Sequence, residues 1–92
     1  MDKRVQETLL ILQEECAEVT QAVSKCFRFG LDNFKPGKPA TNVEHLEVEI
    51  GDLLAMIDIL VEQGVVSKEN LVAATAAKKL NLKQWSNIYE NM

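Results

Sequence analysis

Cysteine and histidine are scarce in this chain, and their scarcity excludes two common kinds of site. Among its 92 residues are two cysteines and one histidine. Cys16 and Cys26 fall on one predicted helix, about 15 Å apart along its axis, so they cannot form a disulfide with each other. Free cysteines are usually buried, and we expect both as reduced thiols in the core. With His45 as the sole histidine, a Cys-His metal site lacks ligands.

Long hydrophobic runs and a net positive charge are also lacking. No apolar run approaches the roughly 20 residues that cross a bilayer, and the first residues lead into an amphipathic helix, unlike a signal peptide. We therefore expect a cytoplasmic protein. The formal net charge of −4 argues against a nucleic-acid or membrane-surface partner. Four basic residues nevertheless cluster in one stretch that could hold a small phosphorylated ligand: Lys25, Arg28, Lys35 and Lys38.

Period-two alternation, internal repeats and low-complexity segments are absent, and the apolar spacing is helical. A first helix is expected over about 2–29, ended by Gly30 as a left-handed cap. Its apolar stripe comprises Val5, Leu9, Leu12, Cys16, Val19, Val23 and Cys26. Both prolines and two of the four glycines fall in 30–40, which predicts a loop.

Capping signals predict where the later helices begin. Thr41 and Glu44 fit a capping box for a second helix over about 42–63, which Gly64 ends. Ser67 is the expected N-cap of a third helix reaching about residue 80, and the short link favours antiparallel packing of the second and third helices. A short fourth helix is expected after Asn81.

These elements predict a single domain, 1–92, of the all-α class. We expect an antiparallel helical bundle of two long helices plus one or two shorter C-terminal helices. A chain of this size buries only roughly two-thirds of its unfolded surface, so we also expect a homodimer or homotetramer.

Four acidic residues, spaced in pairs, carry most of the functional information. Glu15 and Glu18 are three residues apart in the first helix, as are Glu49 and Asp52 in the second, and this spacing puts each pair on one helix face. If the two faces meet, four negative charges gather, which is costly unless a cation neutralises them. Oxygen-only ligation suits Mg²⁺, and Mn²⁺ as a substitute.

A helical wheel separates these acids from ordinary solvated ones. In the second helix a broad apolar face is expected from Leu46, Ile50, Leu53, Leu54, Ile57, Leu60 and Val61, while Glu44, Glu47, Asp58 and Glu62 point to water. Glu49 and Asp52 belong to neither group and lie on a flank with His45. Glu15 and Glu18 likewise border the first helix's stripe. Solvated glutamates at helical spacing remain the alternative interpretation.

The string Glu14-Glu15-Cys16-Ala17-Glu18, followed by Glu49-Ile50-Gly51-Asp52, resembles the EExxE and ExxD signature of MazG-like nucleoside triphosphate pyrophosphohydrolases. The similarity spans roughly 12–64 and is greatest to small stand-alone members from phages and bacteria. The interval between the two motifs is somewhat longer here than in many relatives. A phage-encoded protein of this kind would act in the host cytoplasm.

The resemblance implies hydrolysis of a (deoxy)nucleoside triphosphate between the α and β phosphates, giving a monophosphate and pyrophosphate. It implies Mg²⁺ held by Glu15, Glu18, Glu49 and Asp52, with Glu14 as the candidate that orients or deprotonates the water. Lys25 is the candidate phosphate contact, and the other candidate substrate-binding residues are Gln21, Arg28, Lys35 and Lys38. Purine substrates such as dGTP or dATP rest on the resemblance alone, and damaged nucleotides are an open alternative.

Two other functions are compatible with acidic helices. A non-catalytic helical interaction module would use the acids for a structural cation or a basic partner. A redox di-metal bundle needs Glu-x-x-His pairs, which the sequence lacks. The few aromatic residues, which include Phe27, Phe29 and Phe34, are expected in the core or an interface more than as a platform for a nucleobase.

Overall fold

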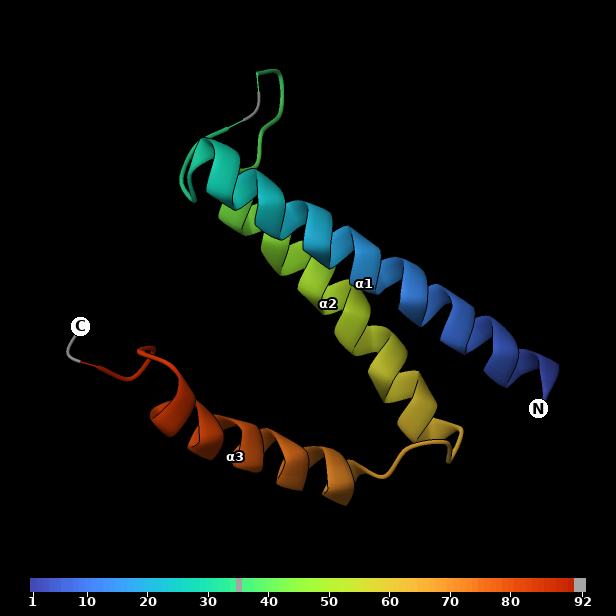
Figure 1. Cartoon of the computed structure of the whole chain (residues 1–92). Helices are drawn as coiled ribbons and strands as arrows, with labels where there is room; N and C mark the ends of the chain where they lie inside the picture. Colours follow the sequence, from blue (N-terminus) through green and yellow to red (C-terminus); the bar gives the residue numbers. More distant parts are fainter. Residues whose placement is uncertain (35, 91–92) are drawn as a thin grey trace.

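The computed structural model describes residues 1–34 and 36–90, and these form three helices joined by short connections (Figure 1). They are α1 (Lys3–Phe29), α2 (Asn42–Glu62) and α3 (Lys68–Trp85). The only β structure within the described residues is an isolated antiparallel bridge between Phe34 and Thr41. The all-α prediction is confirmed.

The helix starts follow the predicted caps. The Thr41 hydroxyl accepts from the Glu44 N–H at 3.2 Å, and the Glu44 carboxylate accepts in return from the Thr41 N–H at 3.0 Å. These hydrogen bonds lower the pKa of Glu44. At α3, the Ser67 hydroxyl accepts from the Asn70 N–H at 3.2 Å. Both predicted N-caps are confirmed.

Gly30 ends α1 in a different conformation from the one expected. Its φ of 88° is positive, but its ψ of 157° is extended, so it is not a left-handed helical cap. The Gly30 N–H still bonds to the Cys26 carbonyl at 2.9 Å, and the chain then turns directly into the loop. The glycine is required for its positive φ.

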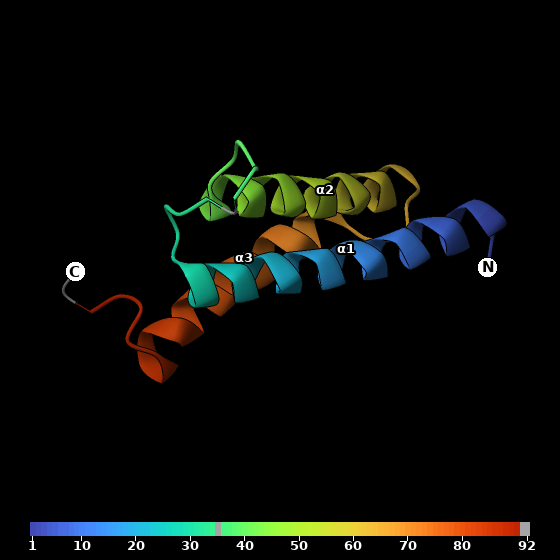
Figure 2. The same ribbon diagram turned by 90° about the horizontal axis from the view of Figure 1, so that it is seen from above.

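Helices α1 and α2 lie side by side and antiparallel (Figures 1 and 2). Polar hydrogen bonds hold both ends of this pair. At one end the Gln63 amide donates to the Thr8 hydroxyl at 3.0 Å, and at the other the Asn42 amide donates to the Gly30 carbonyl at 2.8 Å. The buried residues lie along the same seam: Thr8, Ala22, Asn42 and Leu60.

The predicted packing of the second and third helices is wrong within the described chain. α3 diverges from the α1/α2 pair and has no buried residue (Figure 1). It also continues to Trp85, because neither glycine nor proline interrupts 68–85. Residues 86–90 form bends and turns, so the fourth helix is not found there.

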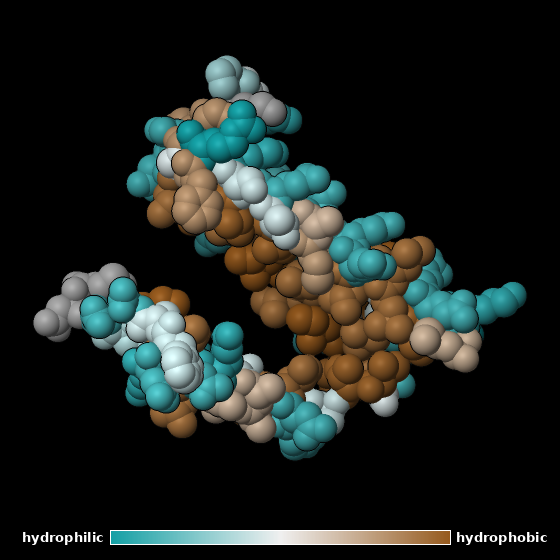
Figure 3. Space-filling view, viewed as in Figure 1, coloured by the Kyte–Doolittle hydropathy of each residue, from teal (hydrophilic) through white to brown (hydrophobic). Residues whose placement is uncertain are grey.

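The apolar face expected on α2 is covered only in part. Leu60 is buried in the seam, but the helix turns the flank with Glu49 toward α1, and other residues of the apolar face stay exposed. Ile50 is 39% exposed and Leu54 is 53% exposed. Figure 3 shows apolar surface on the side of the helix pair that is turned toward α3. Cys16 is exposed, so its predicted burial is wrong, whereas Cys26 is half-buried. Most apolar contact in this chain is therefore confined to one helix-helix seam.

The extended shape exposes much more surface than a compact chain of this mass. The accessible surface is 7494 Å², against about 5,400 Å² for a folded monomer of 10.3 kDa. The radius of gyration is 16.2 Å, against about 12 Å for a compact domain of this length. No helix in the described part of the chain has the length and apolar character to cross a membrane.

Candidate functional site

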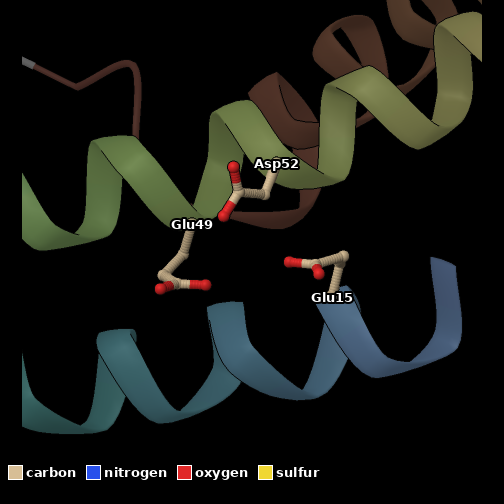
Figure 4. Close-up of side chains that lie close together, drawn as sticks. All are labelled: Glu15, Glu49 and Asp52. Carbon is tan, nitrogen blue, oxygen red and sulfur yellow. The ribbon is translucent and has the colours of Figure 1, made fainter. Parts of the chain in front are cut away.

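Three carboxylates meet midway along the seam between α1 and α2. Glu15 comes from α1, and Glu49 and Asp52 come from α2; one carboxylate oxygen from each lies within 4.8 Å of the others. In Figure 4 the three side chains extend into the space between the two helices. The expected convergence of acids from neighbouring helices is confirmed for these three residues.

The helical spacing explains why α2 contributes two of them. Glu49 and Asp52 are three residues apart, which places them only about 60° from each other around the helix axis. Both therefore lie close to the line of α2 that faces α1. The Glu49 side chain is only 13% exposed, and Glu15 is half-buried, whereas Asp52 is exposed. The cluster thus has a covered side and an open side from which a ligand can approach.

Glu18, the fourth expected ligand, is exposed on α1 and is not one of the three grouped carboxylates. Its charge nevertheless acts on Glu15. Glu18 therefore stays a predicted ligand, near the cluster but at its edge. Glu14 is exposed one residue before Glu15 and also acts on it electrostatically.

Burial and charge repulsion together perturb Glu15. Partial burial raises the pKa of the Glu15 carboxyl above its ordinary value, and the negative charges of Asp52, Glu49, Glu18 and Glu14 raise that pKa further. A carboxylate in this position is stabilised by any nearby positive charge. Carboxylates from the two helices are here held close together, and this local concentration of negative charge favours binding of a cation.

The donor set fits a hard divalent cation. The three residues offer only carboxylate oxygens, which Mg²⁺ and Mn²⁺ prefer over nitrogen or sulfur. Mg²⁺ usually keeps several waters and binds one or two carboxylates plus substrate phosphates, so three acids with one open side are sufficient. The chain thus has the ligands for such an ion.

His45 lies beside one of these acids, from the preceding turn of α2. Its Nε2 atom lies 3.6 Å from a carboxylate oxygen of Glu49. His45 precedes Glu49 by four residues, and this spacing puts the two side chains on one face of α2. His45 therefore links the acidic cluster to the basic region beyond it.

The basic region is a cavity of about 230 Å³ where the loop joins the two helices. It is lined by Lys25, Lys38, Pro39, Ala40, Asn42 and His45. An adjoining cavity of about 370 Å³ shares Lys25 and Asn42 with it and also includes Arg28. Three of the predicted substrate-binding residues, Lys25, Arg28 and Lys38, thus line cavities.

The other two predicted substrate-binding residues are not placed there. Gln21 is exposed on α1 and lines neither cavity as described. Lys35 lies outside the described residues. Asn42, which was not among these predictions, lines both cavities. It is buried, and its side-chain amide donates a hydrogen bond to the Gly30 carbonyl, which fixes the start of the loop.

An antiparallel helix pair that presents clustered carboxylates beside a basic cavity defines a helical protein suited to a cation and a polyphosphate together. The chain belongs to the MazG nucleotide pyrophosphohydrolase domain family, whose model matches residues 3–84. Membership implies nucleotide pyrophosphohydrolase activity, a hydrolase reaction. No curated protein and no solved structure matched the chain.

Proposed function

We propose that this protein hydrolyses a (deoxy)nucleoside triphosphate between its α and β phosphates. One water adds across the phosphoanhydride bridge, and the products are a nucleoside monophosphate and pyrophosphate. The observation that carries the proposal is the approach of Glu15, Glu49 and Asp52 to within 4.8 Å across the helix seam. This cluster supplies a negatively charged site that would hold the divalent cation used in polyphosphate hydrolysis.

The chain's own residues have distinct roles in this proposal. Glu15, Glu49 and Asp52 hold the ion, with Glu18 as a fourth ligand from the same face of α1. A bound Mg²⁺ supplies neutralisation of phosphate charge and a fixed orientation for the reacting groups. His45, 3.6 Å from Glu49, restrains that carboxylate. Glu14 orients or deprotonates the water.

The cationic residues bind the substrate from the loop side. Lys25 is half-buried and lines both cavities, so its ammonium group is positioned for phosphate oxygens. Lys38 and Arg28 add positive charge, one in each cavity. These cations offset the electrostatic repulsion between a triphosphate and an acidic protein.

The direct test is a substrate panel. Purified protein with Mg²⁺ or Mn²⁺ is incubated with canonical and modified triphosphates, and monophosphate and pyrophosphate are measured. We expect turnover that EDTA abolishes, with purine deoxynucleotides such as dGTP and dATP among the substrates. Metal-dependent melting without release of pyrophosphate from any nucleotide would instead support a metal-binding interaction module and contradict the proposal.

We also propose that the active form is a homodimer or homotetramer. About 2,000 Å² of surface is exposed beyond that of a compact monomer, more than the roughly 800 Å² that each partner contributes to a standard protein interface. Ile50 and Leu54 share one uncovered face of α2, and a second copy would cover such a face. This assembly would act on the nucleotide pool of the cytoplasm.

A further inference from the structure

The larger cavity differs in chemistry from the rest of the site. It has a volume of about 370 Å³, within the range of small-molecule pockets, and its lining combines two phenylalanines and a proline with two cations. The lining residues are Lys25, Arg28, Phe29, Phe34, Pro36 and Asn42. The cations alone would be sufficient to bind phosphate, so the aromatic rings indicate that this cavity binds a second, less polar part of the ligand.

The rings are available to a ligand. Phe29 is 48% exposed and Phe34 is 60% exposed, so neither lies in the core, which was one of the two locations expected for the aromatic residues. The Arg28 guanidinium lies over the Phe29 ring, with its central carbon 4.9 Å from the ring centroid. Nucleobases stack on phenylalanine rings and on guanidinium planes, and this cavity offers both.

Backbone hydrogen bonds hold Phe34 in place at the cavity. The Asn42 N–H bonds to the Asn33 carbonyl at 3.0 Å, and the Val43 N–H bonds to the Leu31 carbonyl at 2.9 Å. Phe34 itself pairs with Thr41 in the isolated bridge. The loop is therefore anchored to the start of α2, which limits how far the ring can move away from the cavity.

The position of the cavity relative to the acids fits one extended ligand. Asn42 precedes Glu49 by seven residues of α2, about 10 Å of helix at about 1.5 Å per residue. His45 lies between them, facing the smaller cavity and within 3.6 Å of Glu49. The acidic cluster, the smaller cavity and the larger cavity thus follow one another along α2.

We propose that the larger cavity binds the nucleobase and sugar of the substrate, with the base against Phe34 and Phe29. The phosphates then run past Lys25 and His45 to the acidic cluster. This assignment rests on the proposed function, because it takes the ligand to be a nucleotide. It makes the junction of α1 with the loop the part of the protein that recognises the base.

The test compares two phenylalanines of different location. Phe34→Ala removes a ring from the cavity, whereas Phe27→Ala removes a ring that is 87% exposed on α1 and does not line it. We expect Phe34→Ala to weaken binding of a nucleoside monophosphate about tenfold, given the strength of base stacking on aromatic side chains. Phe27→Ala should leave it unchanged, and Phe34→Trp should retain binding. Circular dichroism verifies that each variant is helical.

Inorganic tripolyphosphate, which has no base, separates stacking from phosphate binding. Its affinity, measured by calorimetry with Mg²⁺, should be equal in wild type and Phe34→Ala. Any of three results would overturn the assignment: an equal loss of affinity for tripolyphosphate and nucleotide in Phe34→Ala, equal effects of the two alanine variants, or nucleotide binding by Phe34→Ala that matches wild type. Monophosphate binding needs no turnover: a wild type that binds it through Phe34 but hydrolyses no triphosphate refutes the proposed function alone.

Discussion

Glu15 on α1 and Asp52 on α2 bring carboxylate oxygens to within 4.8 Å of each other from opposite sides of the helix seam. Asp52 is the neighbouring charge with the largest effect in raising the pKa of Glu15. The two helices are therefore held together despite a local repulsion between like charges. Removing one charge and adding a cation are two ways to relieve it, and each can be measured.

Glu15→Gln is expected to stabilise the metal-free protein at neutral pH, because the neutral amide removes the repulsion. A raised carboxyl pKa means that the folded state holds its proton more tightly than the unfolded state. The wild type should thus gain stability as the pH falls through the raised pKa, and its difference from the variant should shrink. Thermal melting in EDTA across this pH range is the measurement, and a variant that melts lower at neutral pH would contradict it.

Added metal ions should stabilise wild type more than Glu15→Gln, the reverse of the effect expected without metal. Mg²⁺ or Mn²⁺ should raise the melting temperature of wild type, because an ion that binds only the folded state stabilises it. Glu15→Gln should show little increase. Glu62→Gln, an exposed acid at the end of α2, is the matched control and should respond like wild type.

Asp52→Asn should lower pyrophosphate release by about a hundredfold or more while the helices are retained, given the typical effect of removing one group that stabilises transition-state charge. The assay is turnover of the best triphosphate at saturating Mg²⁺. Asp58→Asn, an exposed acid elsewhere on α2, serves as the control. Similar rates for both variants would exclude a catalytic role for Asp52.

Lys25→Met should raise KM for the triphosphate about tenfold, because a cation that faces both cavities is lost from the phosphate path. Methionine keeps much of the side chain's length and apolar contact. The exposed Lys78, on α3, provides a control in Lys78→Met. Steady-state kinetics distinguish this effect from a fall in kcat, and an unchanged KM would remove Lys25 from the substrate path.

Leu54→Glu should disrupt assembly, because it places a charge on the uncovered apolar face of α2. Light scattering at micromolar concentration should give a homodimer or homotetramer for wild type and a smaller species for the variant. Val72→Glu, on an exposed position of α3, tests whether that helix belongs to the same interface. A wild type that is monomeric and fully active would refute the proposed assembly.

Local chemistry made much of this fold predictable. Thr41, Glu44 and Ser67 satisfy helix-terminal N–H groups through their own side chains, so their roles depend on few distant contacts. The same is true of the spacing that brings Glu49 and Asp52 onto one flank. Such features are determined by neighbours within a few residues, and the sequence displays those neighbours directly.

Features set by packing between elements were less predictable. The wheel assigned Ile50 and Leu54 to the buried face, but an apolar face can be buried by another copy as readily as by α1, and periodicity does not distinguish the two. The predicted packing of α3 against α2 also depended on contact between elements, which the short link between these helices does not determine. Phe34 was missed as a cavity residue because its position depends on loop hydrogen bonds to the start of α2.

The location of the acids on continuous helices has a consequence for how sequences of this kind can change. Insertions between Gly30 and Thr41 alter the span that connects the helices without rotating either one, so the distance between motifs is free to drift. A single residue inserted inside α1 between Glu15 and Lys25 would instead turn everything beyond it by about 100°. Variation in length should therefore accumulate at the connection and be rare within the helices.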